Sequence, residues 1–167
     1  PQTFNIRVRR GDSLSQLRLH SYHSIEDFTL QRPELEAVSQ KTPLLLDKQG
    51  NPVQKHNMTD DGLFLSADVN EKVVAYKAKN VGEVIDISKD GYYRAEDFWE
   101  RIEPQAGGYV TLDKTGFFIM RSKELLVVPP KLAIEIVPHN ERLVEARIHY
   151  AGFAHPGFGY DPDGNPM

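Results

Sequence analysis

Residues that could do chemistry lie close together in the segment "HYAGFAHPGFGYDPDGNPM", which runs from His149 to Met167. Histidine side chains can transfer protons or bind metals near neutral pH. Closely spaced glycines let the backbone turn sharply or approach another group. The 6 histidines of the chain include no His-x-His pair, the spacing that places two metal ligands on one strand. The glycines leave two alternatives open, a plain β-turn and a close approach to a flat or charged ligand.

Several catalytic motifs are absent from the sequence. The chain has no cysteine, which excludes disulfides, thiolate metal sites and a cysteine nucleophile. The zinc site of metal-dependent nucleobase deaminases, H-x-E … P-C-x-x-C, is excluded for the same reason. The nucleophile elbow G-x-S-x-G, the P-loop and G-x-G-x-x-G are also missing. We therefore expect no zinc and no serine hydrolase chemistry.

Two charged or titratable side chains precede the glycines. In "VEARIHY" apolar residues alternate with polar ones, and His149 belongs to the polar set, so we interpret it as a residue of a strand's polar face. Arg142 follows Glu141 in the sequence. It either belongs to a solvated charged surface or reaches an anionic ligand, because the planar guanidinium group suits phosphate.

The composition is that of a soluble globular protein. The chain has 167 residues, 40% of them apolar and 26% charged, with a net charge of −4. No long basic run suggests a nucleic-acid partner. No apolar run is long enough to span a membrane. The absence of cysteine agrees with a reducing compartment, so we expect a cytoplasmic protein that contacts neither membrane nor nucleic acid.

Short strands dominate the predicted secondary structure. Phe4, Ile6 and Val8 alternate with polar residues, and a Gly-Asp turn separates this strand from a second one around Leu17 and Leu19. Residues 20–57 have the character of a connector with a short helix in "PELEAVSQ". Seven further strands are expected in "EKVVAYKA", "GEVIDIS", "GYVTLD", "GFFIMRS", "ELLVVPP", "KLAIEIV" and "VEARIHYAGF". This pattern predicts a sandwich or barrel.

One helix is expected to interrupt the strands. The segment "RAEDFWERI", residues 94–102, places Phe98, Trp99 and Ile102 on one stripe, with Glu96, Asp97 and Arg101 on the outside. The sequence "SKDG" before it is a suitable turn.

Two motifs resemble the dUTPase and dCTP deaminase superfamily. "GDSLSQLRL", Gly11 to Leu19, resembles the superfamily segment G-D-x-[IL]-[AS]-Q-L. "HYAGFAHPGFG", His149 to Gly159, resembles T-A-G-F-I-D-P-G-[FW]-x-G, which forms part of the nucleotide pocket. "GFFIMRSKELLVVPPKLAIEI" resembles the strand pair before that pocket. The resemblance implies a mostly-β, dUTPase-like distorted barrel.

The order of the two motifs implies two copies of the domain. In one domain of the superfamily the G-D-x-L-S-Q-L segment follows the glycine-rich segment, whereas here it precedes it by roughly 140 residues. The chain therefore resembles part of a long, two-copy dCTP deaminase. Residues 1–19 would close the first copy, residues 20–57 would connect, and residues 58–167 would begin a second copy that is truncated at its C-terminal end.

The resemblance implies a reaction and a general base. In the superfamily a glutamate activates the water that attacks C4 of cytosine, without a metal at the reacting carbon. Mg²⁺ accompanies the triphosphate. The glutamate lies on the strand after the D-P-G-F turn, so we expect it outside this chain, and no catalytic residue is assigned within it. Members of the superfamily form trimers, so a homo-oligomer, trimeric or pseudo-trimeric, is expected.

The resemblance also implies which residues bind the deoxynucleoside triphosphate. Gln16 would support the pocket through its amide, and Arg142 would contact phosphate. Gly152, Phe153 and their neighbours would line the base and sugar. The complete expected set is Gln16, Arg142, Tyr150, Ala151, Gly152, Phe153, His155 and Gly157.

The second copy departs from the superfamily pattern at two places. The superfamily also has a segment R-S-S-x-x-x-R, whose last arginine corresponds to Arg142. Its two serines fall near Pro138 and His139, and the aspartate of D-P-G-F is His155. These departures leave two alternatives to dCTP deamination. The copy could be a non-catalytic domain that serves assembly, or the protein could hydrolyse dUTP to release pyrophosphate.

Overall fold

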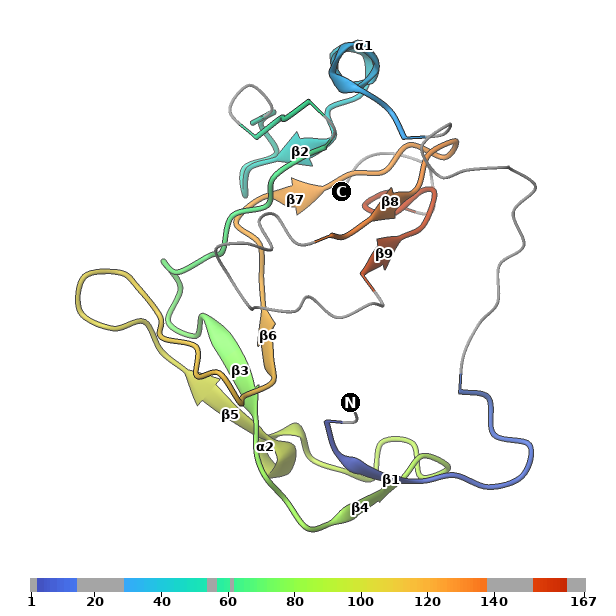
Figure 1. Ribbon diagram of the computed structural model, residues 1–167, viewed down its shortest axis with the longest axis vertical. Helices are drawn as coiled ribbons and strands as arrows, with labels where there is room; N and C mark the ends of the chain where they lie inside the picture. Colours follow the sequence, from blue (N-terminus) through green and yellow to red (C-terminus); the bar gives the residue numbers. More distant parts are fainter. Residues whose placement is uncertain (1–2, 15–28, 54–56, 61, 138–151, 162–167) are drawn as a thin grey trace. The chain divides into compact units, whose positions relative to one another are not determined.

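The computed structural model describes residues 3–14, 29–53, 57–60, 62–137 and 152–161 (Figure 1). These residues form nine short strands and two helices. They divide into two compact units with separate sets of buried side chains. The first unit draws on Pro1–Ser21 and Asp68–Arg121, and the second on Tyr22–Ala67 and Ser122–Met167.

An antiparallel sheet of three strands forms the centre of the first unit. Strand β3 (Ala75–Ala78) lies between β5 (Trp99–Ile102) and β6 (Phe118–Met120) (Figure 1). Ala75 pairs with both neighbouring strands and is buried, as is Val74 before it. Small and β-branched side chains at the start of β3 thus allow both flanking strands to pack closely.

A parallel strand pair and an aromatic cluster complete the first unit. Strand β1 (Asn5–Arg7) pairs with β4 (Val84–Asp86), which lies far along the chain. Helix α2 (Ala95–Phe98) precedes β5 directly. The ring of Phe4 packs edge-on against Phe98 at 5.4 Å and against Trp99 at 5.3 Å, which ties the start of β1 to the junction of α2 and β5.

Helix α1 (Arg32–Lys41) belongs to the second unit. Pro33 lies in its first turn, where a missing backbone N–H costs nothing. The backbone N–H of Gln31 donates to Oε2 of Glu34 at 2.9 Å, which satisfies one donor at the helix start. Leu35 and Ser39 are four residues apart and are the buried side chains of the helix.

Two small antiparallel sheets form the rest of the second unit. Strand β2 (Leu45–Leu46) pairs with β7 (Leu125–Leu126), and strand β8 (Ile134–Glu135) pairs with β9 (Phe153–Ala154). The core of the second unit contains a run of three leucines, two of which form β2, and the two valines that follow β7. Its buried apolar side chains are Leu35, Leu44, Leu45, Leu46, Val127, Val128 and Ala154.

The expected helix at 94–102 is shorter than predicted. It ends at Phe98, and residues 99–102 form β5 instead, because each of them pairs with a residue of β3. The segment "GYVTLD" is not a strand either. Tyr109 makes an isolated bridge to Gln105 and closes a loop there. The expected mostly-β character is confirmed, and the described strands form open sheets of two or three strands.

Most of the other predictions agree with the described elements. A strand lies at 5–7, and the helix expected in "PELEAVSQ" is α1. Strands also occur within "EKVVAYKA", "GEVIDIS", "GFFIMRS", "ELLVVPP" and "KLAIEIV". The second N-terminal strand, around Leu17 and Leu19, lies outside the described residues. Neither helix in the described part of the chain is long and apolar enough to cross a membrane.

Candidate functional site

The glycine-rich segment forms a tight double turn after β9. The N–H of Phe158 donates to the carbonyl of His155 at 3.0 Å, with Pro156 and Gly157 at the central positions. Gly157 has a φ of 81°, and proline followed by a left-handed glycine is the signature of a type II turn. The N–H of Tyr160 then donates to the carbonyl of Gly157 at 3.2 Å. Of the two alternatives left open by the sequence, the structure shows the β-turn.

The turn is anchored to the chain just after β7. The N–H of Gly157 donates to the carbonyl of Val128 at 2.9 Å, and the N–H of Val128 donates to the carbonyl of Phe158 at 2.8 Å. Val127 and Val128 are fully buried. This reciprocal pair of backbone hydrogen bonds fixes the turn on the core of the second unit, as a ladder does between strands.

At two glycines of the segment, other atoms of the protein lie too close to leave room for a side chain. A Cβ at Gly159 would lie 2.3 Å from the backbone oxygen of Leu126, and a Cβ at Gly152 would lie 2.7 Å from Cβ of Ile136. The N–H of Ile136 also donates to the carbonyl of Gly152 at 2.6 Å. The close approach that the glycines permit is thus to neighbouring strands.

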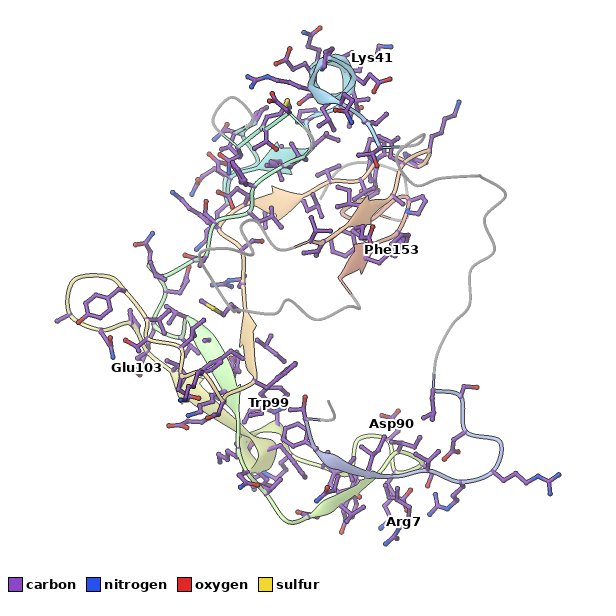
Figure 2. The ribbon with its side chains drawn as sticks, viewed as in Figure 1. Arg7, Lys41, Asp90, Trp99, Glu103 and Phe153 are labelled. Carbon is purple, nitrogen blue, oxygen red and sulfur yellow. The ribbon has the colours of Figure 1, made fainter. Side chains whose placement is uncertain are left out.

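Two aromatic side chains are presented on the surface by this arrangement. Phe153 on β9 is 42% exposed and lies opposite Glu135 of β8 (Figure 2). Phe158 at the end of the turn is 45% exposed. The next residue after Phe153, Ala154, is buried, as the alternation of a strand requires. Exposed rings of this kind can stack on a flat ligand.

His155 begins the turn and is exposed. Its Nδ1 lies 2.8 Å from the carbonyl oxygen of Pro156. Its ring contacts Phe158 edge-on, with centroids 5.8 Å apart and an angle of 78° between the planes. The side chain is therefore held by a hydrogen bond on one side and a ring on the other.

A buried carboxylate supports the strand that carries the turn. Glu124, immediately before β7, accepts from Nδ2 of Asn57 at 3.0 Å and from the N–H of Ser66 at 2.8 Å. Burial alone would raise the pKa of Glu124, but these hydrogen bonds outweigh it and hold the pKa below its ordinary value. The charged form of Glu124 thus joins the 57–66 segment to β7.

A second polar cluster lies in the first unit, at the motif "RVRRGD". Arg9 forms a two-bond pair with the buried carboxylate of Asp86, with distances of 2.7 and 2.5 Å, and also donates to Oγ of Ser88. The hydrogen bond from Arg9 is the main reason why the pKa of Asp86 lies far below its ordinary value. The N–H of Arg9 donates to Oδ2 of Asp12 at 2.6 Å, and Gly11 between them has a φ of 97°.

This cluster fixes the start of "GDSLSQL". The turn from Arg9 to Asp12 is closed in both directions, because the N–H of Asp12 donates to the carbonyl of Arg9 at 3.1 Å. The N–H of Asp86 donates to the hydroxyl oxygen of Tyr93 at 2.7 Å. The Gly-Asp turn is therefore anchored through Arg9 to β4 and the loop that follows it.

A half-open pocket of about 320 Å³ also lies in the first unit, along the start of β3 and the end of β6. It is lined by Glu71, Lys72, Val73, Val74, Ala75, Tyr76, Ile119, Met120 and Arg121. Of the expected binding residues, the four that the structure describes do not line this pocket. The glycine-rich turn therefore remains the candidate site.

The structure describes half of the expected binding residues. Gly152, Phe153, His155 and Gly157 come together on β9 and the turn after it. The other four, Gln16, Arg142, Tyr150 and Ala151, lie outside the described residues, as do Pro138 and His139, and their placement stays a prediction.

Sequence reasoning missed the residues that hold the turn. The turn and the strands beside it are held by contacts between segments that are distant along the chain, and these contacts involve Val128, Ile136 and Glu124. The only signal in the sequence was the buried character of "ELLVVPP". Phe158 was noted as part of the resemblance and was not assigned to the site.

The sequence profile of one protein family matches residues 31–166. That family is described as 2'-deoxycytidine 5'-triphosphate deaminase (DCD), C-terminal domain. No protein in a set of curated sequences matches the chain.

Among solved structures, the chain is similar to the crystal structure of 2'-deoxycytidine 5'-triphosphate deaminase from Agrobacterium tumefaciens, with 30% sequence identity and a TM-score of 0.67. The match covers 83% of this chain and 39% of that one, so the chain spans well under half of the length of this similar protein.

Proposed function

The chain belongs to the family of 2'-deoxycytidine 5'-triphosphate deaminase C-terminal domains, and from this premise we propose that the protein converts dCTP and water into dUTP and ammonia. The expected family and its dUTPase-like β fold are confirmed. The division into two copies stays a prediction.

The observation that carries the proposal is the family match across the anchored turn. The matched residues, 31–166, include β8, β9, the double turn and the strand on which it rests. Two reciprocal backbone hydrogen bonds hold the turn that carries Phe158, and the pairing of β9 with β8 holds Phe153. Such preorganised aromatic side chains suit a flat pyrimidine ring.

We assign roles to the chain's own residues as follows. Phe153 contacts the base or sugar with its ring, while Gly152 and Gly157 shape the backbone beside it. Tyr150 and Ala151 extend this lining. Arg142 contacts phosphate, for which its planar guanidinium group is suited. Gln16 supports the pocket through its amide.

The proposed chemistry is general acid–base catalysis. A carboxylate removes a proton from water as the water attacks C4 of cytosine, and the proton is returned to the amino group, which leaves as ammonia. We propose a glutamate in this role and no metal at the reacting carbon. No residue of this chain is assigned as that base.

Mg²⁺ is proposed to arrive with the substrate, bound to oxygens of the triphosphate. In the part of the chain that the structure describes, no group of three or more His, Asp or Glu side chains is placed to hold a metal ion. No described residue is therefore assigned to a resident metal.

Binding is tested by titrating this chain with dCTP and Mg²⁺, and the chain is expected to bind dCTP. The reaction is tested in a protein that joins this chain to the segment with the expected glutamate, by following ammonia and dUTP, which should be released in equal amounts. Phe153→Ala should weaken dCTP binding about tenfold, because one aromatic contact with a base contributes roughly 1–3 kcal/mol. Gln40→Ala, an exposed residue of α1, is the control and should leave binding unchanged.

A second candidate is a non-catalytic copy that serves assembly of a homo-oligomer. It is favoured by the replacement of the expected aspartate and serines by His155, Pro138 and His139. Thermal stabilisation by dCTP without ammonia release, in the protein that also has the expected glutamate, would support this candidate and contradict the proposed reaction. Release of pyrophosphate from dUTP would instead support a dUTP-hydrolysing protein.

A further inference from the structure

The half-open pocket of the first unit is a hollow with exposed apolar walls. Its most buried lining residues are Val74 and Ala75, at the start of β3. Tyr76 of β3 and Ile119 of β6 are cross-strand partners, so their side chains lie next to each other on the same face of the sheet. Both line the pocket, and they are 43% and 48% exposed. Large side chains thus remain in contact with solvent around a hollow of about 320 Å³.

Three charged side chains line this pocket, and two of them pair with each other. Nη2 of Arg121 lies 3.6 Å from Oε1 of Glu71 and also 3.6 Å from Oδ2 of the buried Asp68. The guanidinium charge of Arg121 is therefore balanced by carboxylates of the protein. Lys72 is exposed and forms no ion pair with any residue that the structure describes. The pocket thus presents one cation that has no partner of its own.

The size, polarity and charge of the pocket together restrict its ligand. A hollow of this volume lies at the small end of ligand pockets, which suits a molecule with a single ring. The ring of Tyr76 and the thioether of Met120 both make favourable contacts with aromatic rings. An ammonium group such as that of Lys72 donates charge-assisted hydrogen bonds to a carboxylate. Several negative charges on one ligand are disfavoured, because the carboxylate of Glu71 lies in the same pocket.

We propose that this pocket binds a small aromatic carboxylate. The ring lies against Tyr76, Ile119 and Met120, and the carboxylate accepts hydrogen bonds from Nζ of Lys72. All the lining residues belong to the first unit, whereas β9 and the turn after it belong to the second. The inference therefore adds a second binding site and does not rest on the proposed function.

Two probes with the same ring and nearly the same shape test the role of charge. 3-Phenylpropionate has one negative charge, and 3-phenylpropanamide has none. In ¹H–¹⁵N spectra of the whole chain, 3-phenylpropionate should move the amide signals of residues 71–76 and 119–121. A Kd of about 1 mM is expected for a ligand of roughly ten non-hydrogen atoms. The amide should bind about fivefold more weakly, because it makes no ion pair. Equal affinities, or signals that move only outside these residues, would overturn the proposal.

Substitutions of Lys72 test which cation is used. Lys72→Met removes the charge and keeps a long aliphatic side chain, so it should bind 3-phenylpropionate about fivefold more weakly and lose the preference over the amide. Lys72→Arg keeps a cation and should retain that preference. The control is Lys114→Met, because Lys114 is an exposed lysine of the same unit that does not line the pocket. It should bind as the parent protein does. An unchanged preference in Lys72→Met shows that the proposal is wrong.

Titration with dCTP separates this inference from the proposed function. The several phosphate charges of dCTP should keep it out of a pocket that contains Glu71, so the signals of residues 71–76 should stay in place. If dCTP moves these signals and 3-phenylpropionate does not, the inference fails while the proposed binding of dCTP stands. If 3-phenylpropionate binds as expected and dCTP does not bind the chain at all, only the proposed function is contradicted.

Discussion

Gly159 and Gly157 share a left-handed backbone but differ in their surroundings. Their φ angles are 79° and 81°, yet a Cβ at Gly159 would lie 2.3 Å from the backbone oxygen of Leu126, while a Cβ at Gly157 would meet nothing within 4 Å. Gly157→Ala should therefore cost only the backbone strain, about 1 kcal/mol. Gly159→Ala should cost about 1–3 kcal/mol more, because β7 must move.

Urea unfolding of the two alanine variants measures this difference directly. Equal losses of unfolding free energy would show that the approach to Leu126 does not restrict the turn. Both variants have the same change in side chain, so the comparison cancels the effect of alanine on the unfolded chain.

Asp86 gives the first unit a predictable dependence on pH. Its folded-state pKa is lowered, chiefly by the hydrogen bond from Arg9 and then by that from Ser88. A lowered pKa means that the charged form contributes stability above the ordinary carboxyl pKa of about 4 and that this contribution is lost as the pH falls toward the folded value. Acid should thus loosen the pairing of β1 with β4.

Asp86→Asn tests that dependence. The variant should be less stable than the parent protein at pH 7, because the neutral amide of Asn cannot form an ion pair with the guanidinium group of Arg9. The difference should shrink below about pH 4, where the parent loses the same interaction. The measurement is the urea midpoint of unfolding for both proteins at a series of pH values from 7 downward. A difference between the two midpoints that does not change with pH would contradict this role of Asp86.

At the scale of elements, the local sequence pattern predicted the wrong secondary structure where pairing with a distant strand determines it. Phe98, Trp99 and Ile102 lie on one stripe of a helix, but Trp99 and Ile102 also pair with Ala78 and Ala75 of β3. Four paired residues and contacts of Trp99 with Phe4 and Phe117 outweigh the helical preference of this short segment. Nothing within residues 94–102 reveals that partner.

The candidate site shows the same division. The sequence "HPGF" predicts its own turn, because proline and a left-handed glycine define the type locally. The anchoring of that turn on Val128, about 30 residues earlier, depends on a strand pairing that a single sequence does not specify. The residues of the turn were therefore predictable from the sequence and its resemblance, and the residues that hold the turn were not.

Helix α1 provides a prediction at this scale. Glu34 accepts from the N–H of Gln31 at the helix start, while Glu36 pairs with Arg32 on the exposed surface at 3.0 Å. Glu34→Ala should cost about 0.5–1 kcal/mol, because a backbone donor loses its partner. Glu36→Ala, the same change two residues further along the helix, should cost about 0.3–0.5 kcal/mol at most.

Hydrogen exchange of the α1 amides distinguishes the two variants. Protection of the first turn should fall more in Glu34→Ala than in Glu36→Ala, and added salt should reduce only the effect of Glu36→Ala. Identical losses would indicate that the helix start is held by packing of Leu35 and not by its cap.

At the scale of the whole molecule, composition predicted a globular protein with enough apolar residues for a core, but not how that core is divided. The buried side chains fall into two sets. Val74, Ala75 and Phe98 belong to the first unit, whereas the leucines of 44–46 with Val127 and Val128 belong to the second. Each unit combines segments from distant parts of the chain, so no single break in composition marks the boundary between them.

Because each unit has its own core, shortening a buried side chain in one unit should destabilise that unit and not the other. Leu45→Ala and Phe98→Ala each remove a side chain that is at most 4% exposed, and each should cost about 2–5 kcal/mol in its own unit. Amide exchange should accelerate at β2, β7 and the 155–160 turn in Leu45→Ala, and at β3 and β5 in Phe98→Ala. Because the turn rests on Val127 and Val128, Leu45→Ala should weaken dCTP binding more than Phe98→Ala does. Uniform acceleration across both units in either variant would show instead that the chain unfolds as one cooperative body.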